Sequence, residues 1–413
     1  MDLSKLCSTY EVLLRHMEKD GYCTQYIKSV EFEINWIKRN PWLSEYKSYL
    51  EVYEERIKRG RNPVLSQSRI YHKRSLYTLL QRFEESGEFP NHHHKIPIVK
   101  KSAYTNLNDY FKKIVDKFKE GAVGSNYSQS TIDKCVSKVS CFFLFLQNKG
   151  HNSIETVTES DVLSFFTGED GELCRSRSYK RDIETVLVFC SNISEGINRI
   201  KHFLPPIKKR RKNVQYLTQE ESDNIRDTLE SDTSDLSKRD IAIGMLLYFT
   251  GMRAGDISDL RFSDIDWTKE TIYRAQNKTG VFLEIPMSVN VGNALYDYIN
   301  EERPDNSDPH VFLWCKPPFE PIDAGAIWPI TARIYKAAKI RQNPGDRRGS
   351  HLFRHHVATH LAMKGFSQPV ISEILGHEAP ESLDYYLSSD IEHLRTCALS
   401  IEDYPVTEEV FQL

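Results

Sequence analysis

The spacing of apolar residues predicts a chain made mostly of helices. Residues 107–122 place apolar side chains on one helical stripe, and the runs at 131–150 and 178–193 repeat that pattern. We therefore predict a helical domain over residues 100–203, and similar patterns predict a helical N-terminal domain over residues 1–90. The stripe at 107–122 consists of Leu107, Tyr110, Phe111, Ile114 and Phe118.

The C-terminal half mixes two periodicities. Residues 238–260 combine a buried apolar helix, a break that contains glycine, and a short second helix. Residues 271–286 form two strand-like runs joined by a turn rich in Asn, Lys and Gly, which indicates a β-hairpin. Helical spacing returns at 288–300 and 327–340. The predicted fold class is α+β, mainly helical, with one small β-sheet.

Proline and charge mark the domain boundaries. Pro205 and Pro206 stop a helix, and Thr218 followed by Glu220 and Glu221 is typical of a new helix N-terminus. We predict a basic linker at 204–213 and a last domain at 214–413. A softer boundary at 88–106 contains two prolines and lacks apolar periodicity.

Composition narrows the class of protein. A chain of 413 residues with 39% hydrophobic and 27% charged residues is typical of two or three folded domains. Apolar runs are too short to span a bilayer, and the N-terminus lacks the pattern of a signal peptide, so we expect a cytoplasmic protein. The 8 cysteines are scattered without a CxxC, which favours reduced thiols over disulfides or a zinc ribbon.

Charge distribution is more informative than the net charge of −3. A basic strip near the predicted linker can bind phosphates while acidic residues elsewhere keep the total near zero. Such a strip is equally typical of a solvated linker, and charge alone leaves both interpretations open. The strip contains Lys208, Lys209, Arg210, Arg211 and Lys212.

Residues 350–387 combine five histidines with one arginine and end near two adjacent tyrosines. His351 and Arg354 lie three positions apart on a predicted helix, beside an apolar stripe, so both face one place. We expect Ser367 to cap the next helix and Gly376 to end it, with His377 directly after. These donors could converge on a small anion.

A metal site is not indicated. His356 and His360 have the spacing of helical metal ligands, and residues 92–94 are three consecutive histidines. Neither group has acidic or cysteine partners that would make such a site persuasive.

The combination of motifs resembles the tyrosine recombinases, also called the phage integrase family. The stretch HLFRHHVAT is similar to that family's H-x-L-R-H-x-x-A-T box, and LGH is followed by Tyr386 nine residues after His377. Upstream, LLYFTGMRAGDISDLRFSDID resembles the first arginine box, and NKTGVFLEIPM resembles the hairpin that carries the lysine. Phe353 and His356 depart from the usual Leu and Thr or Ser, and Asp256 replaces the usual Glu.

The resemblance implies a set of catalytic residues and no metal or cofactor. Tyr386, and not its neighbour Tyr385, is the implied nucleophile, which forms a 3′-phosphotyrosyl bond. Two arginines hold the phosphate oxygens, the lysine is the general acid, and the histidines assist proton transfer and phosphate binding. Asp256 is expected to support the first arginine. The remaining implied catalytic residues are Arg253, Lys278, His351, Arg354 and His377.

The same resemblance implies the partners. It implies a site-specific recombinase that acts as a homotetramer on double-stranded DNA with specific sites, through a Holliday junction, in the bacterial nucleoid. It also implies that residues 100–203 are a helical core-binding domain that binds DNA and that residues 214–413 are the catalytic domain. Residues 1–90 lie outside the resemblance and are a candidate additional DNA-binding domain, and accessory DNA-bending or directionality proteins are candidate partners. The apolar and acidic tail at 402–413 either packs on a neighbouring protomer or frays. Alternatives are a type IB topoisomerase and a catalytically inactive DNA-binding regulator.

Overall fold

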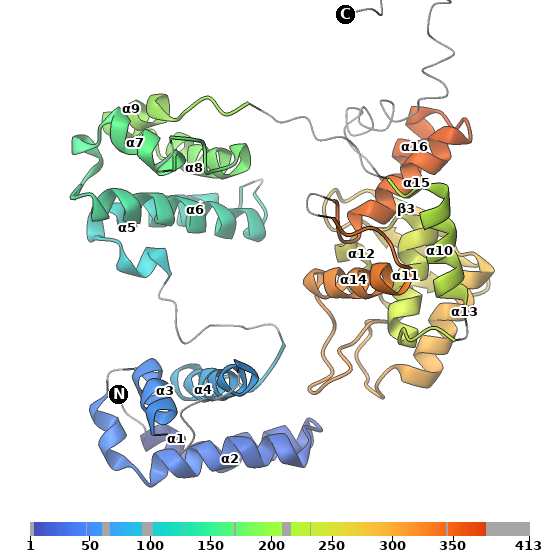
Figure 1. The fold of residues 1–413 in the computed structure, drawn as a ribbon, viewed down its shortest axis with the longest axis horizontal. Coiled ribbons are helices and arrows are strands. Elements are labelled where there is room, and N and C mark those ends of the chain that lie inside the picture. The colour runs from blue at the N-terminus through green and yellow to red at the C-terminus, as the bar shows by residue number, and fades with distance from the viewer. Residues whose placement is uncertain are drawn as a thin grey trace, which may run out of the picture. The chain divides into compact units, whose positions relative to one another are not determined.

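The structure is a computed structural model, and most of its described residues are helical (Figure 1). It describes residues 4–46, 48–59, 67–92, 102–125, 127–168, 171–208, 216–231, 233–343 and 346–376. Two compact units divide the chain: Pro97–Lys212 is one, and Met1–Ile96 together with Asn213–Leu413 is the other. The predicted fold class, mainly helical with one small sheet, is confirmed. The finer boundaries at 90, 203 and 214 stay predictions.

The N-terminal region contains α1 (Ser4–Lys19), α2 (Thr24–Lys38), α3 (Tyr49–Lys58) and α4 (Gln67–Ser86). A buried carboxylate, Glu33, lies among these helices and accepts hydrogen bonds from Arg56 (2.8 Å), Lys73 (2.6 Å) and Tyr77 (3.1 Å). Burial opposes ionisation of Glu33, yet the hydrogen bonds from Arg56 and Lys73 lower its pKa on balance. The buried charge is therefore paired, as a stable core requires.

The unit at 97–212 contains α5 (Asp109–Ala122), α6 (Gln129–Asn148), α7 (Glu159–Phe166), α8 (Arg177–Phe189) and α9 (Glu195–Phe203). Four of the five residues of the predicted stripe are buried, and Tyr110 packs at the edge of the same core. Phe111 stacks on Phe143 with ring centroids 4.8 Å apart. The helical interpretation of this region is confirmed because its apolar stripes meet in one aromatic core.

The C-terminal region is organised around α11 (Lys238–Thr250), a nearly continuous apolar run whose residues 242–247 are all buried. It packs against α10 (Gln219–Glu230), α13 (Val289–Asp297), α14 (Ile327–Ala337) and α15 (His351–Met363). Figure 1 shows α15 and α16 (Gln368–Leu375) together at one end of this region and α13 toward the other. The predicted start of α10 is confirmed, because Thr218 and Glu221 form a reciprocal capping box.

The small sheet is antiparallel in the order β1 (Ile265–Asp266), β2 (Thr271–Ala275), β3 (Phe282–Pro286). Ala275 pairs with Phe282, so the turn at 276–281 closes the hairpin predicted from sequence. Two backbone hydrogen bonds of 2.8 Å close that turn, from Gln276 to Val281 and from Gly280 back to Gln276. Lys278 therefore lies at the tip of a defined hairpin.

The predicted cap of α16 is wrong. Ser367 precedes α16, but its side chain accepts no capping hydrogen bond. Pro369 occupies the second position of the helix and has no N–H, so one of the usual targets of a capping oxygen is missing. Gly376 ends α16 as predicted, in the left-handed conformation with φ of 63°.

Within the described ranges, no helix combines the length and the apolarity needed to cross a membrane.

Candidate active site

Arg253 reaches the site from the break between α11 and α12 (Ala254–Ser258). Gly251 ends α11 with φ of 62°, so the chain turns sharply and Arg253 precedes the next helix. The partly buried guanidinium of Arg253 donates one hydrogen bond to Gln276 Oε1 and another to the backbone oxygen of Gly376, at 3.1 Å. The arginine is thereby tied to both the hairpin turn and the end of α16.

Arg354 reaches the same place from the first turn of α15. Only 6% of its surface is exposed, and it donates to the backbone oxygens of Gly251 (3.0 Å) and Leu375. The C-terminal carbonyls of a helix carry partial negative charge and lack partners within the helix. Both arginines use the carbonyls that end α16, and this shared anchor brings together two residues that are distant in sequence.

His351 is the exposed first residue of α15. Partial desolvation lowers its pKa, and the positive charges of Arg354, Arg347, Lys278 and Arg253 lower it further. The lowered pKa favours the neutral imidazole, which has a nitrogen that can accept a proton. Lys278 and both predicted arginines are therefore among the cations that lower the pKa of His351.

Asp256 ties α12 to the turn that carries Lys278. Its buried carboxylate accepts a 2.8 Å hydrogen bond from the backbone N–H of Asn277. The Asn277 side chain donates to the backbone oxygen of Gly255 at 3.2 Å and accepts from Arg274 at 3.0 Å. The network holds the residue next to Lys278 from both sides.

Several predicted site residues lie outside the described residues. These are His377, Tyr386 and its neighbour Tyr385, together with four of the five residues of the basic strip. Lys208 is the one member of the strip that is described, and it is exposed. Gly376 directly precedes His377, so the end of α16 marks where the undescribed part of the motif begins.

Sequence reasoning missed two residues that belong to the cluster. Gln276 is 3% exposed and bonds directly to Arg253, while Arg347 acts electrostatically on His351. A signal for Gln276 is present in the strand alternation, because Ile272, Arg274 and Gln276 share one face and Ile272 is fully buried. A polar residue at an inward position needs hydrogen-bond partners. Arg347 gives no such signal in the sequence.

The other histidines of α15 have structural partners. His356 hydrogen-bonds Ser222 at 3.1 Å and stacks on Tyr248, which joins α15 to α10 and α11. Burial lowers the pKa of His356 to about 4, with a smaller contribution from His360. Among the described residues, no group of three potential ligands is placed to hold a metal ion.

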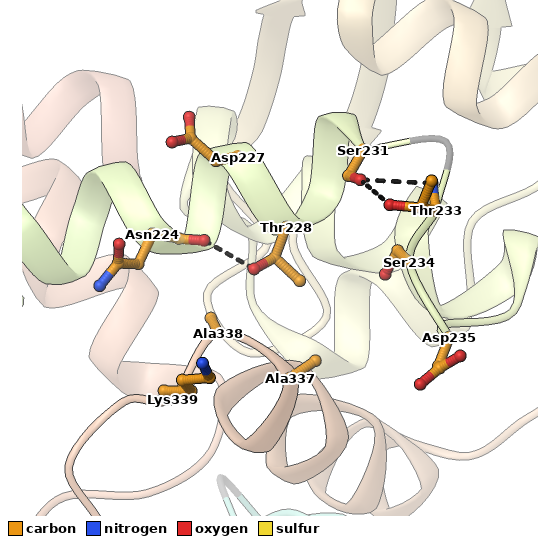
Figure 2. A pocket seen from close by; sticks show the side chains of 10 residues that line it. All are labelled: Asn224, Asp227, Thr228, Ser231, Thr233, Ser234, Asp235, Ala337, Ala338 and Lys339. Atoms are coloured by element: carbon orange, nitrogen blue, oxygen red, sulfur yellow. Dashed lines mark hydrogen bonds between the residues drawn. The ribbon is translucent and has the colours of Figure 1, made fainter.

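A separate depression lies between α10, the segment that follows it and the end of α14 (Figure 2). Hydroxyl and carboxylate groups dominate its lining, and Lys339 is its one lysine. Some hydroxyls bond to near neighbours, as Ser231 does to Thr233 at 2.9 Å and Thr228 to the backbone oxygen of Asn224 at 2.7 Å. None of the lining residues belongs to the predicted catalytic set.

Comparisons with known proteins agree on one family. The family model described as "Phage integrase family" matches residues 215–393. A putative integrase/recombinase, y4gC, from Sinorhizobium fredii is 35% identical over 46% of this chain and 96% of its own length. The tyrosine recombinase XerC of Bacillus subtilis is 28% identical over 71% of this chain and 96% of its own.

A solved structure supports the fold. The site-specific recombinase XerH, in a pre-cleavage complex with its difH substrate, superimposes with a TM-score of 0.53. The match covers 72% of this chain and 97% of XerH at 16% sequence identity. The arrangement of helices and the small sheet is therefore shared with that recombinase.

Proposed function

We propose a specific reaction for this chain, which belongs to the phage integrase family and is a site-specific DNA recombinase. In this proposal, Tyr386 cleaves and rejoins DNA at the cluster formed by Arg253, Arg354, Lys278 and His351. One observation carries the proposal: both arginines donate to consecutive backbone carbonyls at the end of α16, directly before the LGH histidine. Two cations held in fixed orientations at one point are suited to a phosphodiester.

The cleavage step exchanges one phosphoester for another. The oxygen of Tyr386 attacks phosphorus and forms the 3′-phosphotyrosyl bond, while the bond from phosphorus to the 5′ oxygen breaks. Neutral His351 takes the proton of the attacking tyrosine, and Lys278 gives a proton to the leaving 5′ oxygen. The energy of the broken bond is conserved in the new one, so rejoining needs no cofactor.

The two arginines stabilise charge on the non-bridging oxygens during the transfer. Guanidinium groups present donors in a plane that matches two phosphate oxygens, which an ammonium group cannot do. Backbone carbonyls orient both side chains before DNA arrives, so little reorganisation remains at the moment of reaction. His377 adds a hydrogen bond to the phosphate, and Asp256 holds the lysine-bearing turn in place through Asn277.

Recombination repeats this step on four strands. A free 5′ hydroxyl from the partner duplex attacks the phosphotyrosyl bond, releases Tyr386 and creates a Holliday junction, which a second round of exchange resolves. We propose a homotetramer on double-stranded DNA with specific sites, acting on the nucleoid inside the cell. The tail at 402–413 is proposed to contact a neighbouring protomer, and unchanged DNA-dependent assembly after its deletion would contradict that contact.

The remaining regions are assigned to DNA binding. We propose that the basic linker crosses the DNA backbone and contacts it through Lys208 and the rest of the basic strip. Residues 1–90 are proposed to bind additional DNA, and accessory DNA-bending or directionality proteins are proposed partners. Phosphate contacts of this kind fix orientation on the duplex without reading its sequence.

A covalent-trapping experiment tests the proposal. The probe is a library of nicked duplexes with randomised arms around the nick, in which cleavage releases a short oligonucleotide and leaves the protein attached. Wild type and Tyr385→Phe should yield adducts that survive SDS, whereas Tyr386→Phe should yield none. Absence of adducts with wild type, or their survival in Tyr386→Phe, would overturn the assignment.

Two further assays separate the alternative activities. A type IB topoisomerase would relax supercoiled plasmids that lack any selected site, whereas a recombinase should act on the recovered sites alone. A catalytically inactive regulator would bind those sites and leave no adduct.

A further inference from the structure

Gln276 is a buried polar residue that neither the family motifs nor the proposed chemistry assigns. It follows β2 directly and is only 3% exposed. A buried amide without hydrogen-bond partners is destabilising, so the partners of Gln276 indicate why it is placed there. Those partners belong to three different parts of the catalytic cluster.

The side chain of Gln276 links Arg253 to the end of α16. Its Oε1 accepts hydrogen bonds from the Arg253 guanidinium and from the Thr279 hydroxyl, at 2.8 Å for the hydroxyl. Its Nε2 donates to the backbone oxygen of Leu375 at 3.0 Å. Arginine can only donate and a carbonyl can only accept, so these partners fix which way the amide faces.

A second contact closes the arrangement into a ring. The other terminal nitrogen of Arg253 donates to the backbone oxygen of Gly376 at 3.1 Å. A Cβ at position 376 would lie 2.5 Å from both Nε2 and Oε1 of Gln276. Any side chain at position 376 would therefore have to displace the Gln276 amide, and the φ of 63° at Gly376 also favours glycine.

We propose that Gln276 is a positioning residue that orients the Arg253 guanidinium for the scissile phosphate, an inference that rests on the proposed function. Two acceptors, one on each terminal nitrogen, fix the plane of the guanidinium before DNA binds. The backbone of Gln276 also closes the turn that carries Lys278. One residue thus sets the relative placement of an arginine, the catalytic lysine and the corner that precedes His377.

The test compares Gln276→Met with a matched control. Methionine keeps the length of the side chain and removes the three hydrogen bonds of the Gln276 amide. Gln147→Met is the control, because the Gln147 amide likewise both accepts and donates. It accepts from the backbone N–H of Asn108 (2.7 Å) and donates to the backbone oxygen of Asn106 (3.0 Å), but it lies in the unit at 97–212. Each variant is measured for thermal unfolding, DNA affinity and single-turnover adduct formation with the selected nicked duplex.

The expected result is a loss of rate without a loss of binding. Misplacement of a catalytic group by about 1 Å can cost about 100-fold in rate, so we expect Gln276→Met to form adducts about 10- to 100-fold more slowly. DNA affinity should stay at the wild-type level, and Gln147→Met should cleave like wild type. An unchanged cleavage rate in Gln276→Met would overturn the inference.

A neutral substrate separates positioning from simple structural support. A methylphosphonate at the cleavage position lacks one negative oxygen and needs less help from Arg253. If Gln276 acts through Arg253, the defect of Gln276→Met should largely disappear on that substrate. Equal losses on the phosphodiester and the methylphosphonate would indicate a merely structural role and overturn the inference.

A milder variant covers the case in which Gln276→Met does not fold. Thr279→Val removes the hydroxyl that also bonds to Gln276 Oε1, and it should give a smaller loss with the same dependence on substrate charge. No loss, or a loss independent of charge, contradicts the proposal. If wild type itself forms no adduct through Tyr386, the proposed function fails; if wild type does and these variants match it, only the role of Gln276 fails.

Discussion

The C-terminal region has two polar surfaces of opposite character. At the end of α16, backbone carbonyls orient both catalytic arginines, and these arginines lower the pKa of His351 together with Lys278 and Arg347. The depression between α10 and α14 is instead lined by hydroxyls and by the carboxylates of Asp227 and Asp235, with Lys339 as its one cation (Figure 2). The depression is concave, but the cationic donors suited to a phosphodiester belong to the cluster at the end of α16.

The difference shows what a DNA-cleaving site requires. A duplex backbone is a large, exposed anion, so it is bound by oriented cationic donors on an accessible surface. Carboxylates in a hollow would repel it. In this fold, helix ends and glycines with positive φ orient the arginine donors. A concave surface such as the depression does not by itself indicate reactivity.

Loss of an arginine from the cluster should reduce the cleavage rate more than any other change to the cluster. Removing one donor that stabilises transition-state charge typically costs about 10²–10³-fold in rate, and we expect at least that from Arg354→Ala in single-turnover cleavage. Asp227→Lys in the depression is the matched change and should leave the rate unaltered. Equal losses of rate in both variants would contradict the assignment of cleavage to the cluster and not to the depression. Thermal unfolding checks that the protein tolerates alanine at the buried position 354.

Loss of the general acid should have the next largest effect. A positioned acid contributes about 10²–10⁴-fold, so Lys278→Ala should slow cleavage of an ordinary duplex by about 100-fold. Sulfur at the bridging 5′ position makes a leaving group that needs little protonation. Cleavage of such a phosphorothiolate by Lys278→Ala should approach the wild-type rate, and persistence of the full defect would remove Lys278 from this role.

Neutralising the basic strip should weaken binding and leave the chemistry intact. Each phosphate contact adds about 0.9 to the steepness of log affinity against log salt concentration, so glutamine at all five positions of the basic strip should lower that steepness by up to about 4.5. Adduct formation at saturating protein should stay at the wild-type rate. An unchanged slope would show that the strip does not contact DNA.

The smallest effect concerns stability and involves His356. Its pKa of about 4 in the folded chain lies below the ordinary value of 6.5, so the unfolded chain binds the extra proton between these values. Stability should therefore fall as pH drops from about 6.5 to about 4, by at most about 3 kcal/mol at about 1.36 kcal/mol per pKa unit. In His356→Gln, this acid-side fall in unfolding temperature should flatten, and an identical profile would contradict the cause.

The sequence patterns predicted the helices and the hairpin better than they predicted the contacts between residues. The apolar run of α11, the stripe of α5 and the turn at 276–281 follow from local spacing and turn residues, and all three are present. The anchoring of Arg253 and Arg354 could not be predicted because it uses backbone carbonyls, which every residue has. The prediction of a Ser367 cap failed for a local reason, because Pro369 removes one N–H that such a cap binds.

The central claim is that Tyr386 becomes linked to DNA at the α16 cluster. The most direct measurement is protease digestion of the trapped wild-type adduct, followed by mass spectrometry of the peptide that carries the nucleotide. We predict a phosphodiester on Tyr386 and an unmodified Tyr385 in the same peptide. Attachment at Tyr385, or at a residue outside this motif, would contradict the account.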